Sequence, residues 1–254
     1  MIPKVIHYCW FGEKDIPKAQ LEFIKTWHKY CPDWEFKLWN EKTFDVTKFK
    51  YTESAYNQKK YAFVSDYVRV WALNTYGGVY LDTDVELKQN IECFLECDAF
   101  SCVERIGIPF TSAVWGSVAS HELLQMLLNY YNDRVYTKSE QPNTVIISDI
   151  LEKKFNINKF TDSNQIGQLE SSKICIYSSD YFCLDLPHSY ATHHFFDSWS
   201  DTKKEYSYKS YVHDLYYLNQ MSGVRINNRI LKEISKKISL KDIFRMLRWW
   251  IKYK

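Results

Sequence analysis

The chain of 254 residues has few of the residues that interrupt regular structure, with 7 glycines and 6 prolines. This scarcity argues against long flexible linkers and low-complexity tracts, and the sequence contains no internal repeat. No apolar run reaches the roughly 18 residues that a membrane-spanning helix needs. The length is sufficient to bury one substantial core. We therefore expect a single α/β domain with appendages.

Two motifs that bind nucleotides are also absent. The sequence has no G-x-G-x-x-G, which weighs against a dinucleotide site, and no G-x-x-x-x-G-K, which weighs against a P-loop. The 7 cysteines are odd in number, include no C-x-x-C pair, and Cys93, Cys97 and Cys102 lack the spacing of zinc ligands. We expect them to be reduced thiols in a cytoplasmic protein. The opening residues MIPKVIHYCWFG are too short an apolar run for a secretory signal.

The net charge of +2 hides a basic C-terminal segment. Residues 225–254 carry a charge of +8, which leaves −6 for residues 1–224. This pattern favours a localised anionic partner over a nucleic-acid-binding body. In residues 240–254, apolar and basic side chains fall on opposite helical faces, as in a helix that lies on an anionic bilayer. The alternative is a helix docked on its own domain. We predict a domain at 1–224 and a basic amphipathic helical tail at 225–254.

Strands that alternate with helices predict a mostly parallel sheet with ligands at the C-terminal ends of its strands. The predicted strands are residues 4–10, 34–39, 79–87, 99–104, 112–115, 174–177 and 190–194. The predicted helices are residues 17–30, 62–75, 120–131 (with Ser120 as N-cap) and 142–154, and the last 30 residues. Residues 44–58 are ambiguous.

Two aspartates stand close together within the predicted strand 79–87. Its odd positions are apolar or Thr and its even positions are Tyr or acidic, so one face is apolar. Asp82 and Asp84 then share the other face, about 7 Å apart. Carboxylates this close repel each other unless a cation lies beside them. A hard divalent ion that also binds phosphate oxygens, Mg²⁺ or Mn²⁺, meets that need.

The preceding helix, residues 62–75, is apolar except for Ser65, Asp66 and Arg69. Asp66 and Arg69 are three residues apart and therefore neighbours on one face. A charged pair in such a helix is costly unless a partner or ligand satisfies it. A structural ion pair is the alternative to a ligand site. Gly77 and Gly78 are expected to end the helix.

Three ordered blocks together resemble glycosyltransferase family 32. They are IPKVIHYCWFG at residues 2–12, AFVSDYVRVWALNTYGGVYLDTDVEL at 62–87, and ATHHFFDSW at 191–199. Enzymes of this family occur in bacterial capsule and O-antigen loci and in yeast mannosylation, and their core is similar to the glucosylating domain of large clostridial toxins. The resemblance implies a GT-A fold, which is Rossmann-like with a mostly parallel sheet flanked by helices. It also implies a nucleotide-sugar donor, Mn²⁺ or Mg²⁺, and transfer with retention of configuration.

The resemblance assigns catalytic roles to four residues. Asp84 would bind the metal, and Asp82 would reach the donor ribose or sugar and support the metal. Asp66 and Arg69 would hold the hydroxyls of the donor sugar, supported by Ser65.

The resemblance also implies further donor and metal contacts. Trp10 would stack on the base, usually uracil, the alternative being a core tryptophan. Ser198 and Trp199 would contact the departing diphosphate. A histidine of the third block would add a metal ligand, His193 first and His194 second, since spacing alone does not separate them. Phe195 to Asp197 depart from the small residues more usual before the Ser-Trp pair.

These observations predict a metal-dependent retaining glycosyltransferase. Its donor would be UDP-galactose, UDP-glucose or a UDP-N-acetylhexosamine, and its acceptor a lipid-linked or growing surface polysaccharide of capsule or O-antigen type. It would lie in the cytoplasm, peripheral to the inner face of the plasma membrane, and bind no nucleic acid. The alternatives are a nucleotidyltransferase and a sugar-nucleotide-binding protein without turnover.

Overall fold

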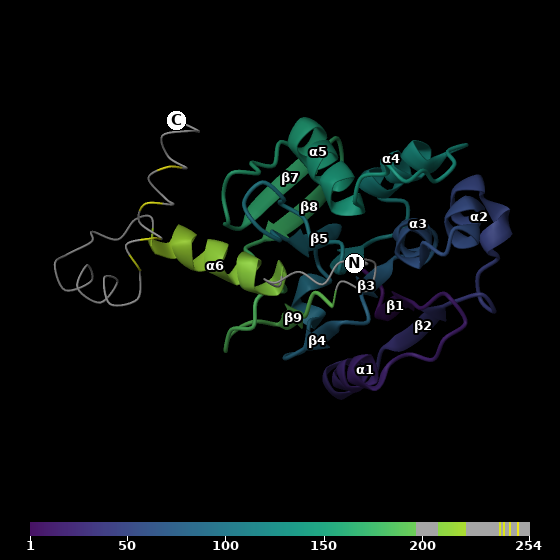
Figure 1. Cartoon of the computed structure of the whole chain (residues 1–254), viewed down its shortest axis with the longest axis horizontal. Coiled ribbons are helices and arrows are strands. Elements are labelled where there is room, and N and C mark those ends of the chain that lie inside the picture. Colours follow the sequence, from purple (N-terminus) through teal and green to yellow (C-terminus); the bar gives the residue numbers. More distant parts are fainter. Residues whose placement is uncertain (197–207, 222–238, 240, 242–243, 245–247, 249–254) are drawn as a thin grey trace. The chain divides into compact units, whose positions relative to one another are not determined.

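The computed structural model describes residues 1–196, 208–221, 239, 241, 244 and 248 (Figure 1). Met1–Tyr216 form one compact unit, and Tyr217–Lys254 form a second. Of the predicted tail, residues 225–254, only four residues are described, so the interfacial helix and the domain boundary stay predictions.

A seven-stranded sheet forms the centre of the first unit, in the order β2-β1-β3-β6-β5-β8-β7. Strands β1, β2, β3, β5 and β8 run in one direction, and β6 and β7 run in the other. This arrangement confirms the predicted α/β, GT-A type of architecture. The strands are β1 Val5–Cys9, β2 Glu35–Trp39, β3 Gly78–Leu81, β5 Ala99–Cys102, β6 Val114–Ser117, β7 Gln165–Leu169 and β8 Ser172–Tyr177.

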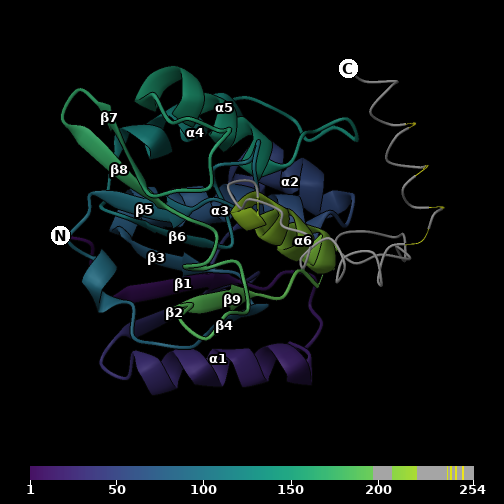
Figure 2. The ribbon, with the colours of Figure 1, turned by 90° about the vertical axis from the view of Figure 1, so that its left-hand side faces the viewer.

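Helices cover both faces of this sheet (Figure 2). One apolar cluster joins the sheet to α2, α3, α4 and α5, and a second joins its other face to α1 and to the two-stranded sheet of β4 and β9. Successive side chains of β3 point to opposite faces of the sheet and so contribute to both clusters. Tyr80 lies in the first cluster, whereas Val79 and Leu81 lie in the second. The remaining elements are α1 Lys18–Tyr30, α2 Lys50–Asn57, α3 Tyr61–Tyr76, β4 Val85–Leu87, α4 Glu122–Tyr131, α5 Asn143–Phe155, β9 Ala191–His193 and α6 Tyr208–Met221, with 3₁₀ turns at Val46–Lys48 and Glu92–Phe94.

The glycine pair Gly77 and Gly78 ends α3 and begins β3, as predicted. Gly77 caps α3 with a positive φ of 63°, and its N–H donates to the Leu73 carbonyl at 2.8 Å. Gly78 has a φ of 110°, and a Cβ atom there would lie only 2.7 Å from the Val5 carbonyl oxygen. Glycine is therefore required where β3 passes beside β1.

Two sequence predictions need correction, and two elements were not predicted. The strand predicted over 79–87 is two strands, because a turn at Asp82–Val85 ends β3 and β4 pairs with β9 instead. The N-cap of α4 is His121, whose Nδ1 accepts from the Leu123 N–H at 3.2 Å, rather than Ser120. The ambiguous segment 44–58 contains α2, and the sequence pattern gave no indication of β7.

Among the described residues, no helix combines the length and apolar character that crossing a bilayer requires.

Candidate metal centre and donor site

The two aspartates of the D-x-D motif lie in the turn between β3 and β4. The Asp82 carbonyl accepts from the Val85 N–H at 3.0 Å, which closes the turn. The Asp82 N–H donates to the Ala113 carbonyl at 2.9 Å, which ties the turn to the segment before β6. The turn therefore holds both carboxylates at the carboxyl end of β3, where ligands bind in open α/β sheets.

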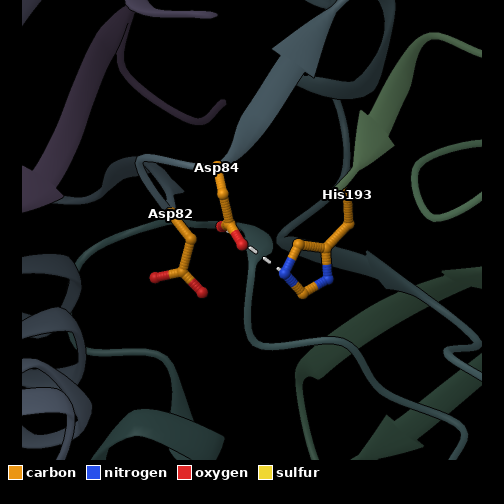
Figure 3. A group of neighbouring side chains, drawn as sticks. All are labelled: Asp82, Asp84 and His193. Carbon is orange, nitrogen blue, oxygen red and sulfur yellow. Dashed lines mark ion pairs between the residues drawn. The ribbon is translucent and has the colours of Figure 1, made fainter. Parts of the chain in front are cut away.

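His193 reaches the same point from β9. Strand β9 pairs antiparallel with β4 and places His193 opposite Val85. Its Nε2 lies 3.5 Å from Asp84 Oδ1, and one ligand atom each of Asp82, Asp84 and His193 lie within 4.8 Å of one another (Figure 3). Of the two histidines proposed from sequence, His193 is thus the one that the structure brings to the aspartates.

Asp84 and His193 form an ion pair. Burial disfavours the Asp84 carboxylate, but His193 and the Phe196 N–H, which donates to Oδ2 at 2.9 Å, lower its pKa to about 2. Burial likewise disfavours the imidazolium, but Asp84 raises the pKa of His193 well above its ordinary value. Because a metal ligand must be a neutral imidazole, a cation here would displace the His193 proton.

The donor set fits a divalent cation. Two carboxylates suit Mg²⁺ and Mn²⁺, which prefer oxygen ligands. The imidazole of His193 favours Mn²⁺, because Mg²⁺ is harder and is usually held by carboxylates, phosphates and water. Three protein ligands also leave coordination positions for phosphate oxygens.

Arg69 joins the metal centre to the apolar helix α3. The residue is only 5% exposed, and its Nη2 lies 3.2 Å from Asp66 Oδ1 and 3.2 Å from Asp82 Oδ1. Its Nη1 donates to the Ser112 carbonyl at 2.8 Å. Asp66 and Arg69 therefore form an ion pair as expected, and Arg69 forms a second ion pair with Asp82.

Tyr80 also holds Asp82 and was not singled out by sequence reasoning. Its hydroxyl donates to Asp82 Oδ1 at 2.9 Å, and the Arg69 guanidinium lies over its ring, 4.5 Å from the centroid. The alternation of residues 79–87 placed Tyr80 on the same side as Asp82, so the sequence already indicated that the two side chains are neighbours.

Asp66 is half-buried and lies beside Arg69 and Asn143. Burial, opposed by Arg69, raises the pKa of Asp66 to about 6. Asn143, the first residue of α5, donates from Nδ2 to the Asp66 carbonyl at 3.3 Å. Its Oδ1 is buried and accepts no hydrogen bond from the described residues. No local motif marks Asn143, because it lies 77 residues from Asp66 in the sequence.

Ser65, in α3, and Trp10, directly after β1, already have hydrogen-bond partners of their own. The Ser65 hydroxyl donates to the Tyr61 carbonyl at 3.1 Å, within α3. Trp10 directly follows β1, on the sheet edge that also carries Asp82, because β1 and β3 are parallel. Its indole N–H donates to the Lys14 carbonyl at 2.6 Å, and its side chain is half-buried.

Of the rest of the third block, His194 joins a second cluster, and Ser198 and Trp199 are not among the described residues. His194 Nε2 lies 3.0 Å from Glu86 Oε2, its Nδ1 lies 3.0 Å from Lys209 Nζ, and its ring stacks on Phe23. It is not among the residues grouped with the aspartates. Ser198 and Trp199 lie outside the described residues, so their contact with a diphosphate stays a prediction.

Comparisons with known proteins find similar sequences among glycosyltransferases. Residues 17–101 match the family described as "Glycosyltransferase sugar-binding region containing DXD motif". Inositol phosphoceramide mannosyltransferase 1 of Schizosaccharomyces pombe is 28% identical over 151 residues, which cover 54% of this chain and 46% of that protein. Uncharacterized glycosyltransferase L373 of Acanthamoeba polyphaga mimivirus is 25% identical over 219 residues, which cover 79% of this chain and 84% of that protein.

Among solved structures, PaToxG Glycosyltransferase has 17% sequence identity and a TM-score of 0.45, over 60% of this chain and 68% of that one. The chain spans less than half the length of the fission-yeast relative. The resemblance to the DXD glycosyltransferases of family 32 is confirmed, because residues 17–101, which include Asp82 and Asp84, match their sugar-binding region.

Proposed function

We propose that the protein is a metal-dependent glycosyltransferase that moves one sugar, with retention, from a nucleoside diphosphate sugar to a saccharide or glycolipid. The observation that carries this proposal is the group of Asp82, Asp84 and His193, whose ligand atoms lie within 4.8 Å of one another. The Asp66–Arg69 pair beside this group supplies further polar atoms for a donor.

Asp84 and His193 would hold the cation, with Asp82 in support. A cation held there would act as a Lewis acid and would stabilise negative charge on the leaving diphosphate. Arg69 and Tyr80 fix the Asp82 carboxylate, and the Phe196 N–H fixes Asp84, so the carboxylates are oriented before any ligand binds. Such preorganisation lowers the cost of reorganising the site during the reaction.

The proposed donor and acceptor rest on the sequence resemblance and on the fission-yeast relative. The sequence resemblance favours UDP-galactose, UDP-glucose or a UDP-N-acetylhexosamine. Because the fission-yeast relative is named a mannosyltransferase, a mannosyl donor such as GDP-mannose is a further candidate. That name also includes a ceramide lipid, which favours a lipid-linked acceptor over a soluble one. A capsule or O-antigen role and a place at the inner face of the plasma membrane are further parts of the proposal.

Two other functions would use the same residues. A nucleotidyltransferase also sets carboxylates around a metal, but it would release pyrophosphate and normally carries a glycine-rich phosphate loop, which the sequence lacks. A binding protein without turnover would bind donor and metal but release nothing. The complete set of Asp66, Arg69, Asp82 and Asp84 favours the transferase.

The test is release of nucleoside diphosphate from a panel of UDP-sugars and GDP-mannose, with Mn²⁺, Mg²⁺ or EDTA. We expect metal-dependent release of UDP or GDP from one donor, because many transferases slowly hydrolyse their donor. Asp84→Asn should abolish release. Asp185→Asn is the matched control, since Asp185 pairs with Lys88 rather than with the metal group. Pyrophosphate as product, or full activity in Asp84→Asn, would contradict the proposal.

The membrane part has a separate test. Deletion of residues 240–254 should reduce co-sedimentation with anionic vesicles while leaving donor hydrolysis intact. Unchanged binding would exclude this segment as the membrane contact.

A further inference from the structure

Two thiols far from the metal centre lie in direct contact. Cys97 is in the turn before β5, and Cys175 is in β8, the strand that pairs in parallel with β5. Their Sγ atoms are 2.7 Å apart. We propose that Cys97 and Cys175 are an oxidisable pair, which a small disulfide such as oxidised glutathione converts to an intramolecular disulfide.

Rigid neighbours hold both residues in place. The β5–β8 register sets Ala99 opposite Ile174 and Phe100 opposite Cys175. Next to Cys97, the Asp98 carboxylate accepts from the Lys173 N–H at 3.2 Å, and the Asp98 carbonyl accepts from the Val118 N–H at 2.8 Å. Because these contacts hold the two Sγ atoms 2.7 Å apart, the cross-link requires little backbone movement.

The other cysteines differ from this pair in access or in partner. Cys102 and Cys183 are 3.7 Å apart, but both side chains are fully buried. Cys93 is exposed and has no cysteine within hydrogen-bond distance among the described residues. Cys97 and Cys175 alone combine a thiol partner with partial exposure. A small oxidant can therefore reach this pair and not the buried one.

The two thiols are suited to different steps. The hydrogen bond with Cys175 lowers the pKa of Cys97 to about 6, while Cys97 raises the pKa of Cys175. Tyr177 adds a hydroxyl 3.6 Å from Cys97 Sγ. Since the thiolate is the nucleophile, Cys97 is the residue that attacks first.

The reaction is an exchange of thiol and disulfide. The Cys97 thiolate attacks one sulfur of oxidised glutathione, which breaks the S–S bond and releases one glutathione thiolate. Cys175 then loses its proton to solvent, and its thiolate attacks Cys97 Sγ and releases the second glutathione. Two cysteine thiols are oxidised and one glutathione disulfide is reduced, so the electrons balance.

The cross-link would leave the metal centre in place. Cys97 precedes the amino end of β5, whereas Asp82 follows the carboxyl end of β3, and β3 and β5 run in the same direction. The pair therefore lies at the opposite edge of the sheet from the metal group. A bond between residues 78 apart in sequence restricts the unfolded chain. We expect oxidation to raise the unfolding temperature and to leave Mn²⁺ binding unchanged.

The experiment treats the full chain with oxidised glutathione, alkylates the remaining thiols after denaturation, and maps peptides by mass spectrometry. We expect one cross-linked peptide that joins Cys97 to Cys175, with Cys9, Cys31, Cys102 and Cys183 alkylated. Cys175→Ser should stop at a glutathione adduct on Cys97, and Cys97→Ser should leave Cys175 a thiol. Cys93→Ser, the matched control, should still form the cross-link.

Glutathione on Cys93 shows that the oxidant is active. If that adduct forms while Cys97 and Cys175 remain thiols in the wild-type protein, the proposal is wrong. A cross-link that joins Cys93 to either residue would also overturn it. Thermal unfolding of the oxidised protein, compared with the same sample after reduction, gives a second readout.

Discussion

Replacement of Arg69 by Met should destabilise the protein strongly and in a pH-dependent way. The guanidinium is 5% exposed and lies between the carboxylates of Asp66 and Asp82. Met keeps much of the aliphatic volume but leaves two carboxylates without their cation. Removal of one partner from a buried ion pair costs about 3–5 kcal/mol. At roughly 2–4 °C per kcal/mol for a domain of this size, Tm should fall by about 6–20 °C.

The pH dependence of the stability loss in Arg69→Met distinguishes the effect of the lost charge from that of the lost packing. Burial raises the pKa of Asp66 from 3.8 to about 6, with Arg69 acting in the opposite direction. A carboxyl group whose folded pKa is raised costs stability as pH rises from its unfolded pKa through its folded pKa. Without Arg69 the folded pKa rises further, so this loss extends to higher pH.

The free energy of unfolding, measured by urea denaturation at pH 5 and pH 8, checks this reasoning. We expect a larger difference between Arg69→Met and wild type at pH 8, where the Asp66 carboxyl group is charged. A cost below about 1 kcal/mol, or one equal at the two pH values, would show that the guanidinium does not hold these carboxylates.

Three further predictions concern the fold and the donor site. His7 is fully buried, its Nε2 lies 2.8 Å from the Gly77 carbonyl, and burial lowers its pKa to about 4. Stability should therefore fall by about 3 kcal/mol as pH drops from 6.5 to below 4, and His7→Gln should remove this component from denaturation curves. Gly116→Ala would set a Cβ 2.0 Å from a ring carbon of buried Phe100, so it should cost about 1–3 kcal/mol or more in urea unfolding, whereas equal stability would show that the ring can move. Tyr80→Phe removes a hydrogen bond to Asp82 worth about 1 kcal/mol, so kcat/KM for donor hydrolysis should fall roughly five-fold, and an unchanged value would exclude a positioning role.

Local patterns in the sequence predicted the helix and the first part of the site. Apolar spacing over residues 62–75 and the glycine pair identified α3 and its end at Tyr76. Alternation placed Tyr80, Asp82 and Asp84 on one side, although the turn that breaks the strand depends on the pairing of β4 with β9. Propensity within one segment does not reveal a change of partner strand.

Contacts between segments far apart in the sequence determine the features of the site that local sequence patterns did not predict. The choice between His193 and His194 rests on the register that sets Val85 opposite His193, which no spacing within residues 191–199 contains. Asn143 reaches Asp66 only because α5 begins beside α3. Strand β7, QIGQL, was missed because polar residues and glycine dominate it and its stability comes from pairing with β8.

The most direct test of the metal centre is the affinity for Mn²⁺, measured by calorimetry, in wild type and in single variants of the two adjacent histidines. We expect His193→Ala to weaken Mn²⁺ binding at least ten-fold, because it removes one of three ligands. His194→Ala should bind Mn²⁺ like the wild type, since His194 pairs with Glu86 instead. Equal affinity in His193→Ala and wild type, or a loss confined to His194→Ala, would contradict a metal centre formed by Asp82, Asp84 and His193.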